Sequence, residues 1–501
     1  MLQMQDLTIV QDKDLHTLIE KLNVTINIGD KVAIIGEEGT GKSTLLQYIY
    51  HPEMIVSYAS VTGKIVNHFK SMAYLPQILP KEDSQLSISD YLYKDIDYNL
   101  FDFNLLYQLA TTLHFDSQRF ADVEQTVAQL SGGEKIKLQL LKLLAQQPDL
   151  LLLDEPSSDL DMETMNWLEK FIAESPLTII FISHDETLLS KTATHIIHLE
   201  QVKKGNQARS TSKALDYKTY INQRQDSRIK QERIAKKERE KQQSRLEKLN
   251  RTKSSVRHNL AATKNDVQGR LLAKKMKNIL SQEKRFEREE KGFTELPDNP
   301  DNIRLFFAAI QTLPAQKILL NYQAEKVITG QIIDFTLKGQ EKIALIGPNG
   351  IGKTTLIRKI YQDLQDKPGV SVGYMPQEYS ENVDQNLTAL EFLSQSGREE
   401  EARTLLAGLK FTRNEILHPI SHLSGGQKAK LFLAKMVFDR NNILLLDEPT
   451  RHFSPSSQPE IRRLLQDYPG AIFTISHDRT FIEQVTQISY QLTEEELIRL
   501  D

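Results

Sequence analysis

The sequence of 501 residues contains no cysteine, which excludes disulfide bonds, thiolate zinc sites, iron–sulfur clusters and cysteine nucleophiles. It also lacks long apolar runs, because the longest ones, such as residues 150–153 and 178–182, are far shorter than the roughly 18 to 20 residues of a membrane helix. Its first residues carry acids where a secretory signal would have a basic end and then an apolar run. These absences predict a soluble chain of a reducing compartment, by default the cytoplasm, with no membrane partner.

What the sequence does contain is typical of a globular protein, with 39% hydrophobic and 26% charged residues and room for two to four domains. The net charge of −4 conceals a strong asymmetry. Residues 203–291 hold 27 lysines and arginines against 11 aspartates and glutamates, a balance of +16 that leaves −20 for the rest of the chain. Two acidic bodies therefore flank a basic segment, and the middle is the part expected to meet a polyanion. The predicted domains are residues 1–202, 203–292 and 293–501.

The same ordered set of short strings occurs on both sides of the basic segment. The first copy reads GEEGTGKST (36–44), YLPQ (74–77), LSGGEK (130–135), LLLLDEP (150–156) and ISHD (182–185). The second copy reads GPNGIGKTT (347–355), YMPQ (374–377), LSGGQK (423–428), LLLDEP (444–449) and ISHD (475–478). The interval from the LSGG serine to the DEP glutamate is identical in the two copies, and so is the interval from that glutamate to the ISHD histidine. Equal spacing predicts one fold used twice.

Each copy has the pattern of a doubly wound α/β core. A predicted strand, residues 31–35 or 342–346, leads directly into the glycine-rich string, and a helix is expected after it. A second helix is expected after LSGG, where apolar residues recur three and four apart. The runs LLLLD and TIIFIS are typical of parallel strands that are covered on both faces.

The GxxxxGK[ST] strings have the chemistry of phosphate loops. Their glycines let backbone amides surround the β and γ phosphates of a nucleotide, the lysine adds a cation, and the hydroxyl joins magnesium. In the first loop we expect Glu37 and Glu38 to point to water, because carboxylates that faced a triphosphate would weaken its binding. The predicted nucleotide-binding residues are Gly36, Gly39, Thr40, Gly41, Lys42, Ser43, Thr44, Gly347, Asn349, Gly350, Gly352, Lys353, Thr354 and Thr355.

Other repeated residues are candidates for ATP hydrolysis. An aspartate that ends an apolar strand can hold magnesium, and the glutamate after it can polarise the water that attacks the γ-phosphate. A DE pair is also a common turn, and a lone histidine is usually structural, but chance does not place a histidine at the same interval after that pair twice. The predicted catalytic residues are Glu155, Glu448, His184, His477, Gln77 and Gln377. The predicted magnesium ligands are Ser43, Gln77, Asp154, Thr354, Gln377 and Asp447.

The LSGG strings add a second phosphate-binding device to each copy, since a serine and two glycines that open a helix present free amides to an anion. The residues concerned are Ser131, Gly132, Gly133, Ser424, Gly425 and Gly426. One nucleotide does not need both devices from the same copy. We therefore expect the copies to face each other head to tail, with two ATP molecules in the joint that bind the copies together until hydrolysis releases them.

In order, these strings resemble the Walker A, Q-loop, signature, Walker B and H-loop motifs of the ATP-binding cassette (ABC) superfamily. The resemblance covers most of the chain and implies ATP hydrolysis, with Glu155 and Glu448 as the catalytic glutamates. The D-loop after the first Walker B motif, SSDLD, is near the family form, but the second, TRHFS, has Ser454 in place of an aspartate. That loop normally reaches the opposite site, so the change puts turnover at the first phosphate loop in question. No clear aromatic residue for adenine stacking precedes either loop.

The basic segment has helical composition, with no proline and one glycine, Gly269, between residues 216 and 291. Leu272, Met276, Ile279 and Phe286 form a narrow seam for one partner helix. Residues 250–267 are polar with little seam, so they are expected to form the turn of an antiparallel helical hairpin. Arms of about 30 to 40 residues would reach about 45 to 60 Å. A balanced charge run would favour a solvated spacer, but sixteen unmatched positive charges favour contact with RNA phosphates.

Two cassettes and a basic helical linker resemble the ABC-F class, which binds ribosomes. In that class the linker enters the tRNA exit (E) site toward the peptidyl-transferase centre, and ATP turnover governs release. The resemblance implies contacts with ribosomal RNA and P-site tRNA, no DNA partner, and a monomer whose cassettes pair within the chain. The segment between Gln77 and Ser131 is short, which leaves no room for the arm of some housekeeping members and favours antibiotic protection. A housekeeping factor and the motor subunit of a transporter are the alternatives; a DNA-repair or chromosome ATPase fits less well.

Overall fold

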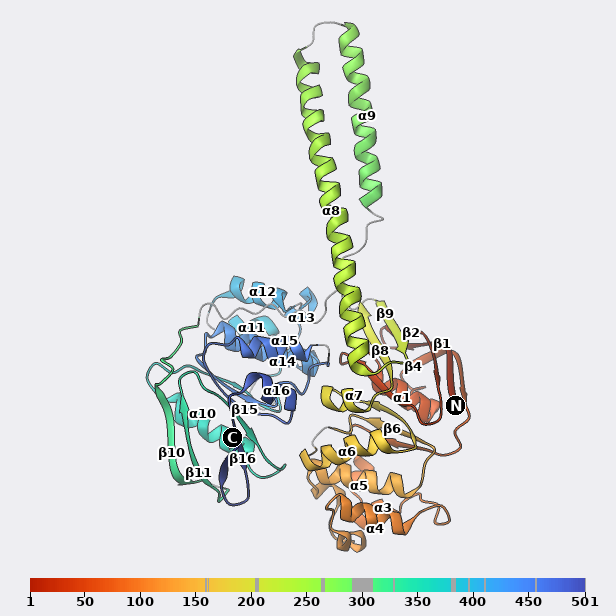
Figure 1. Cartoon of the computed structure of the whole chain (residues 1–501), viewed down its shortest axis with the longest axis vertical. Coiled ribbons are helices and arrows are strands. Elements are labelled where there is room, and N and C mark those ends of the chain that lie inside the picture. The colour runs from red at the N-terminus through yellow and green to blue at the C-terminus, as the bar shows by residue number, and fades with distance from the viewer. Residues whose placement is uncertain are drawn as a thin grey trace. The chain divides into compact units, whose positions relative to one another are not determined.

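The computed structural model describes residues 1–157, 160, 162–202, 207–262, 266–290, 310–327, 329–379, 384–394, 397–409, 411–455 and 457–500. By its contacts the chain divides into two units, Met1–Tyr217 with Pro300–Asp501, and Lys218–Asn299. The first unit contains both copies of the repeated fold, called here cassette 1 (residues 1–216) and cassette 2 (residues 310–500). The second unit contains the basic segment and is named the helical unit (Figure 1).

The main sheet of cassette 1 has six strands in the order β5-β6-β7-β3-β8-β9. The first five run parallel, and β9 is antiparallel to β8. The central strands are buried along their whole length, which explains why they are continuous apolar runs. The strands are β3 (Lys31–Gly36), β5 (Met72–Leu75), β6 (Leu150–Asp154), β7 (Thr178–Ile182), β8 (His195–Val202) and β9 (Gln207–Lys213).

Cassette 2 repeats this sheet in the order β13-β14-β15-β12-β16-β17, again with only the last strand antiparallel. The two sheets correspond strand by strand, so the prediction of one doubly wound fold used twice is confirmed. The strands are β12 (Lys342–Ile346), β13 (Val372–Met375), β14 (Ile443–Asp447), β15 (Ala471–Ile475), β16 (Ile488–Leu492) and β17 (Leu497–Leu500).

A smaller antiparallel sheet accompanies each main sheet. In cassette 1 it has the order β2-β1-β4, formed by β1 (Leu2–Gln11), β2 (Thr17–Ile26) and β4 (Ala59–Asn67). In cassette 2 the described residues form the pair β10 (Ile318–Lys326) and β11 (Ile332–Lys338). Strand β4 belongs to the segment between the phosphate-loop lysine and the YLPQ glutamine, which is longer in cassette 1 than its counterpart in cassette 2. The length difference seen in the sequence therefore corresponds to an added strand.

The helices that follow the phosphate loops and the LSGG strings pack on the sheets and shape the sites. They are α1 (Lys42–Tyr50), α5 (Gly132–Ala145), α10 (Lys353–Gln365) and α14 (Gly425–Phe438). Further helices are α2 (Lys81–Ser84), α3 (Ile88–Tyr93), α4 (Phe103–Thr112), α6 (Met162–Glu174), α7 (Glu186–Thr192), α11 (Ala389–Ser394), α12 (Glu399–Gly408), α13 (Arg413–Leu417), α15 (Gln458–Gln466) and α16 (Arg479–Val485). Residues 77–131 of cassette 1 fold into short helices around an apolar core rather than into a projecting arm.

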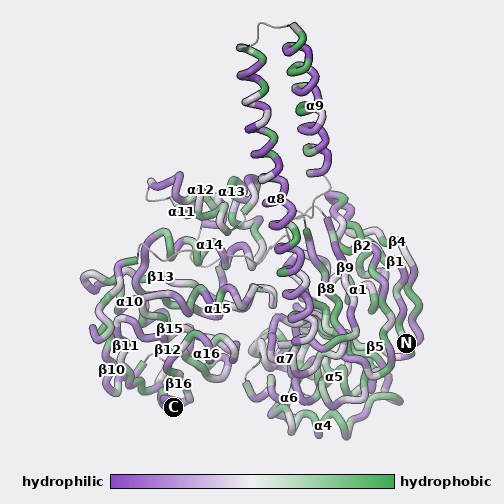
Figure 2. The backbone as a smooth tube through the Cα atoms, turned by 45° about the horizontal axis from the view of Figure 1, so that its top comes forward, coloured by the Kyte–Doolittle hydropathy of each residue, from purple (hydrophilic) through white to green (hydrophobic). Residues whose placement is uncertain are grey.

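The helical unit consists of α8 (Tyr217–Ala262) and α9 (Asp266–Glu290), two mostly hydrophilic helices (Figure 2). The predicted seam of α9 packs on α8, where Ile279 lies in a cluster with Leu249 and Val256. Polar contacts fix the antiparallel register, since Lys253 Nζ lies 2.7 Å from Glu283 Oε2, and the side-chain amide of Gln242 donates to the Phe286 carbonyl. The prediction of an antiparallel helical hairpin is confirmed.

Two expectations for this segment are corrected by the structure. The turn was expected over residues 250–267, but α8 continues as helix through Ala262. Residues 250–262 are polar because most of the helix surface near the end of the hairpin is exposed to water. The linker was expected to begin at residue 203, but residues 207–213 form β9, the last strand of cassette 1. Residues 203–206 and 291–309, which include the predicted boundary at 292–293, lie outside the described residues. Within the described ranges, no helix is long and apolar enough to cross a membrane.

Candidate active sites

Both phosphate loops have the geometry that the glycines allow. Gly41 and Gly352, each just before a helix, have φ of 90° and 103°, a left-handed conformation that favours glycine. Each loop lysine is buried and folds back on its own loop: Lys42 Nζ donates to the Gly36 carbonyl at 2.9 Å, and Lys353 Nζ donates to the Gly347 carbonyl at 2.7 Å. Each lysine ammonium thus lies inside its own loop, next to the backbone groups that are predicted to bind phosphate.

The predicted magnesium ligands lie together in each cassette. Ser43 Oγ donates to Asp154 Oδ1 at 3.1 Å, and Thr354 Oγ1 donates to Asp447 Oδ2 at 2.9 Å. Burial is the main cause that raises the pKa of Asp154 to about 6 and also raises the pKa of Asp447. A hydroxyl beside a buried carboxylate fits a magnesium ion that takes its remaining ligands from nucleotide phosphates. Tyr74, whose hydroxyl donates to Asp154 at 3.3 Å, belongs to this group and was not predicted.

In cassette 1 the predicted base and histidine are in contact. Glu155 Oε1 lies 3.1 Å from His184 Nε2. Burial alone would raise the pKa of Glu155, but the charges of His184 and Lys42 outweigh it and lower that pKa. The carboxylate is therefore ionised, as a group that accepts a proton from water must be.

Cassette 2 has the same pair in a different state. Glu448 Oε1 lies 3.7 Å from His477 Nε2. With this looser contact, burial and then the neighbouring Asp447 raise the pKa of Glu448 to about 8. The same glutamate thus has a lowered pKa in cassette 1 and a raised pKa in cassette 2, although the motifs match.

The LSGG serines cap the helices that they open. Ser131 Oγ accepts a hydrogen bond from the backbone N–H of Glu134, and Glu134 accepts one from the N–H of Ser131. Ser424 and Gln427 form the same reciprocal box in cassette 2. Such a cap contributes roughly 1 kcal/mol to helix stability, so each signature serine has a structural task besides its predicted one.

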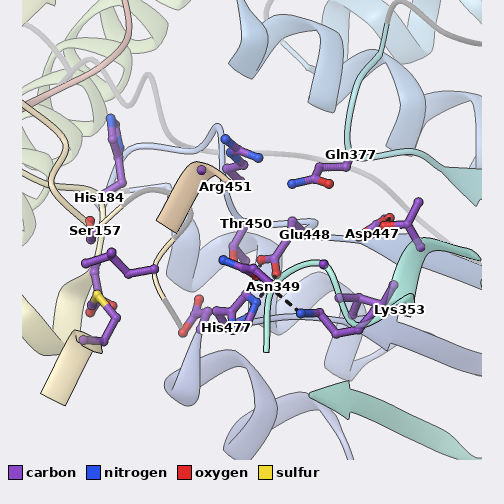
Figure 3. A pocket seen from close by; sticks show the side chains of 18 of the residues that line it. Ser157, His184, Asn349, Lys353, Gln377, Asp447, Glu448, Thr450, Arg451 and His477 are labelled. Atoms are coloured by element: carbon purple, nitrogen blue, oxygen red, sulfur yellow. Dashed lines mark hydrogen bonds and ion pairs between the residues drawn. The ribbon is translucent and has the colours of Figure 1, made fainter. Parts of the chain in front are cut away.

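Residues from both cassettes line each of two cavities. One, of about 540 Å³, brings Ser131 and Gly132 of cassette 1 to the second phosphate loop, including Lys353 and Thr354, together with Gln377. Figure 3 shows this pocket, with a hydrogen bond between Asn349 and Lys353, and with His184 and Ser157 contributed by cassette 1. The pairing of one cassette's signature with the other's phosphate loop is the arrangement that the head-to-tail prediction requires.

The second cavity, of about 480 Å³, lies at the first phosphate loop. It is lined by Lys42, Ser43, Thr44, Gln77, Asp154, Glu155 and His184 of cassette 1 and by Arg451 and His452 of cassette 2. Leu18 and Tyr58 also line it, and Leu18 contacts the place where a side chain at Gly41 would lie. They extend the cavity with apolar surface that sequence reasoning missed, because Leu18 is far from the motifs and Tyr58 follows the loop rather than preceding it.

The expectation that Glu38 points to water is wrong. The backbone N–H of Gly426, in the signature of cassette 2, donates to Glu38 Oε2 at 3.0 Å, and His452 Nδ1 lies 3.5 Å from Glu38 Oε1. Burial would raise the pKa of Glu38, but these two partners outweigh it and lower that pKa. The Glu38 carboxylate thus accepts the hydrogen bond of the Gly426 amide, which in the predicted head-to-tail arrangement would bind a nucleotide phosphate.

The second D-loop reaches cassette 1 without the aspartate that Ser454 replaces. His184 Nδ1 donates to the Phe453 carbonyl at 3.0 Å, and the Gln458 side chain donates to the His184 carbonyl at 2.9 Å. Ser454 itself is buried and contacts Ser457 at 2.9 Å. Of the first D-loop, Ser158, Asp159 and Asp161 lie outside the described residues.

Comparisons with known proteins agree with this geometry. The chain matches the ABC transporter family over residues 19–158 and 331–451. It is 29% identical to the ribosome protection protein VmlR of Bacillus subtilis, over 94% of this chain and 83% of that protein. It is 27% identical to ABC transporter F family member 5 of Arabidopsis thaliana, over 94% of this chain and 72% of that one. A solved structure, the RNase-L inhibitor, shares the fold with a TM-score of 0.61 at 16% identity, over 99% of this chain and 90% of that chain.

The chain therefore belongs to the ABC family, with two tandem ATP-binding, ATP-hydrolysing cassettes. Its relatives are ABC-F proteins, which confirms the resemblance to that class.

We expect Glu38→Gln to raise the affinity of the first site for ATP, because it removes a negative charge that competes with a phosphate for the Gly426 amide. A charge-assisted hydrogen bond of about 1.5 kcal/mol corresponds to roughly tenfold in affinity. The measurement is titration with a fluorescent ATP analogue in a Lys353→Ala background, which weakens the second site. Glu37→Gln is the matched control, since it removes the same charge from the same loop. Equal affinities for both variants would contradict the assignment.

Proposed function

We propose that this chain is a cytoplasmic, ribosome-binding ATPase whose helical unit contacts ribosomal RNA and whose ATP cycle controls binding and release. The observation that carries the proposal is the charge of the helical unit. Helices α8 and α9 contain 21 lysines and arginines against 10 aspartates and glutamates. Three of the ion pairs in the unit use the acids Glu283 and Glu289. The excess of eleven basic over acidic residues remains however these charges pair within the unit.

The shape of the helical unit supports RNA as the partner. A helix of 46 residues spans about 70 Å at 1.5 Å per residue. The packing of Ile279, Leu249 and Val256 holds α9 against it, which makes a paired rod rather than a loose linker. Such a rod fits a cleft in folded RNA better than the groove of a duplex. By analogy with the ABC-F class, the proposal has the rod enter the E site, toward the peptidyl-transferase centre and P-site tRNA.

The cassettes supply the switch in this proposal. The phosphate loops, signature residues and Walker B aspartates bind two ATP molecules between the cassettes of one monomer, with Glu155 and Glu448 positioning the attacking water and the Q-loop and H-loop residues assisting. Magnesium held by Ser43 with Asp154 and by Thr354 with Asp447 would neutralise phosphate charge. Closure around ATP then favours the bound state, and hydrolysis favours release.

Protection of the ribosome from antibiotics is the more specific form of the proposal. It is favoured by the similarity to VmlR, which is named as a ribosome protection protein, and by the short helices in place of an arm at residues 77–131. The end of the hairpin also presents apolar side chains, since Leu260, Val267 and Leu271 are 40%, 69% and 64% exposed. A housekeeping ABC-F factor is the alternative. A transporter motor has no evident use for the basic rod.

We expect the variant with Glu155→Gln and Glu448→Gln to remain on ribosomes in the presence of ATP, because binding without hydrolysis keeps the cassettes closed. The measurement is pelleting of ribosomes with and without ATP, with Glu163→Gln as a control at an exposed position. Pelleting with membranes and not with ribosomes would contradict the proposal.

Neutralising exposed lysines and arginines of the helical unit should weaken ribosome binding and flatten its dependence on salt, since each lost phosphate contact lowers the slope of log K against log salt by about 0.7 to 0.9. The variant changes Lys236, Lys237, Arg239, Lys241, Lys274, Lys275 and Lys277 to glutamine. A matched control changes exposed lysines of the cassettes, such as Lys317 and Lys326. Unchanged binding at every salt concentration would leave the helical unit a mere spacer.

Expression of the chain in a susceptible strain should raise its tolerance to at least one ribosome-directed drug. Substitution of Leu260, Val267 and Leu271 by serine should abolish that gain while ribosome pelleting persists, because the basic rod is intact. Minimum inhibitory concentrations across drug classes are the measurement. Ribosome binding with no change in tolerance to any drug would assign the chain to the housekeeping type.

A further inference from the structure

Two ion pairs join the cassettes beside the H-loops. Arg462 Nη2, on α15 of cassette 2, lies 2.6 Å from Glu186 Oε2, on α7 of cassette 1. Arg479 Nη1, on α16 of cassette 2, lies 3.4 Å from Glu169 Oε1, on α6 of cassette 1. The Arg462 and Glu169 side chains are 5% and 7% exposed, and their partners Glu186 and Arg479 are 17% and 29% exposed, so the first pair is largely buried and the second is partly exposed.

The repeat in the sequence relates these two pairs to each other. Glu169 and Arg462 are equivalent positions, because each follows the Walker B glutamate of its own cassette at the same interval. Glu186 and Arg479 are equivalent as well, since each follows directly after the ISHD string of its own cassette. The two pairs are therefore one contact made twice, with both acids on cassette 1 and both bases on cassette 2.

A third pair of equivalent positions also differs in charge between the cassettes. Lys191 and Gln484 follow the H-loop histidine of their own cassettes at the same interval. Lys191 Nζ lies 2.6 Å from Glu169 within cassette 1, and Arg462 Nε donates to Gln484 Oε1 at 3.2 Å within cassette 2. In cassette 1 the acid Glu169 thus has a cation beside it, whereas in cassette 2 the base Arg462 has a neutral amide beside it. Each cassette therefore has a local partner that suits the charge of its own residue.

We propose that these three positions, called here the pairing set, make cassette 1 associate with cassette 2 and reject a cassette of its own kind. Two copies of cassette 1 in this geometry would set Glu169 against Glu186, and two copies of cassette 2 would set Arg462 against Arg479. Buried like charges across an interface are strongly unfavourable, whereas opposite charges fix partner and register. The H-loop aspartates, Asp185 and Asp478, are the same in both cassettes and do not discriminate.

The test exchanges the pairing set in the full-length chain. Each substitution takes the residue found at the equivalent position of the other cassette, which the same fold already accommodates. The cassette 1 variant makes both faces basic through Glu169→Arg, Glu186→Arg and Lys191→Gln. The cassette 2 variant makes both faces acidic through Arg462→Glu, Arg479→Glu and Gln484→Lys. The exchanged variant carries all six substitutions.

Closure is measured as ATP-induced energy transfer between dyes on two introduced cysteines, one in each cassette, which is simple because the native chain has none. ATP turnover is measured in parallel. Each single-cassette variant should lower closure and turnover by roughly tenfold or more, and the exchanged variant should recover most of both. Lys317→Glu with Lys326→Glu, exposed positions in none of these contacts, controls for the loss of positive charge in the cassette 2 variant.

Wild-type closure in both single-cassette variants would overturn the proposal, as would an exchanged variant no better than they are, since the side chains would then serve only their own cassettes. If thermal unfolding shows that these variants are not folded, only the partly exposed pair of Arg479 and Glu169 is changed. The Arg479→Glu variant is then compared with a variant that carries Glu169→Arg and Lys191→Gln in addition. Loss followed by recovery supports the proposal, and loss without recovery overturns it. Ribosome binding is not part of the readout, so the result is independent of the proposed function.

Discussion

The structure depends on the division of phosphate recognition between two bodies. In the pocket of the second phosphate loop, the lysine and the glycine-rich loop come from cassette 2, while Ser131 and Gly132 at the start of α5 come from cassette 1. At the first phosphate loop, the Gly426 amide at the start of α14 donates to Glu38. Backbone amides at a helix start and a buried lysine both favour an anion, so the two devices add to each other when they face the same nucleotide. Contact between cassettes is therefore a condition for a complete site.

Much of the fold could be predicted from the sequence because four of the five repeated strings in each cassette lie at the ends of strands of the main sheet. The doubly wound cores, the phosphate loops and the pairing of one signature with the opposite loop follow from such local patterns. The position of Glu38 could not be predicted, because its partner Gly426 is 388 residues away and only the tertiary contact decides whether a carboxylate meets water or an amide. The same holds for the hairpin turn, because the polar composition of residues 250–262 is shared by turns and by helices exposed on all sides.

The two sites are unequal for identifiable reasons. In the first, an ionised Glu155 contacts His184, and Glu38 already occupies one signature amide. In the second, Glu448 has a raised pKa, and the loop position equivalent to Glu38 is the neutral Asn349, which accepts a hydrogen bond from Lys353. Near-identical motifs therefore coexist with distinct electrostatics, set by Glu38 in the first loop and by the looser contact between Glu448 and His477 in the second site.

The opposite charges on the facing surfaces also bear on how the chain is made. Under the proposed pairing, a cassette without its counterpart has no partner, because a second copy of itself would bring like charges together. Synthesis of both cassettes in one chain then supplies the two kinds in equal number.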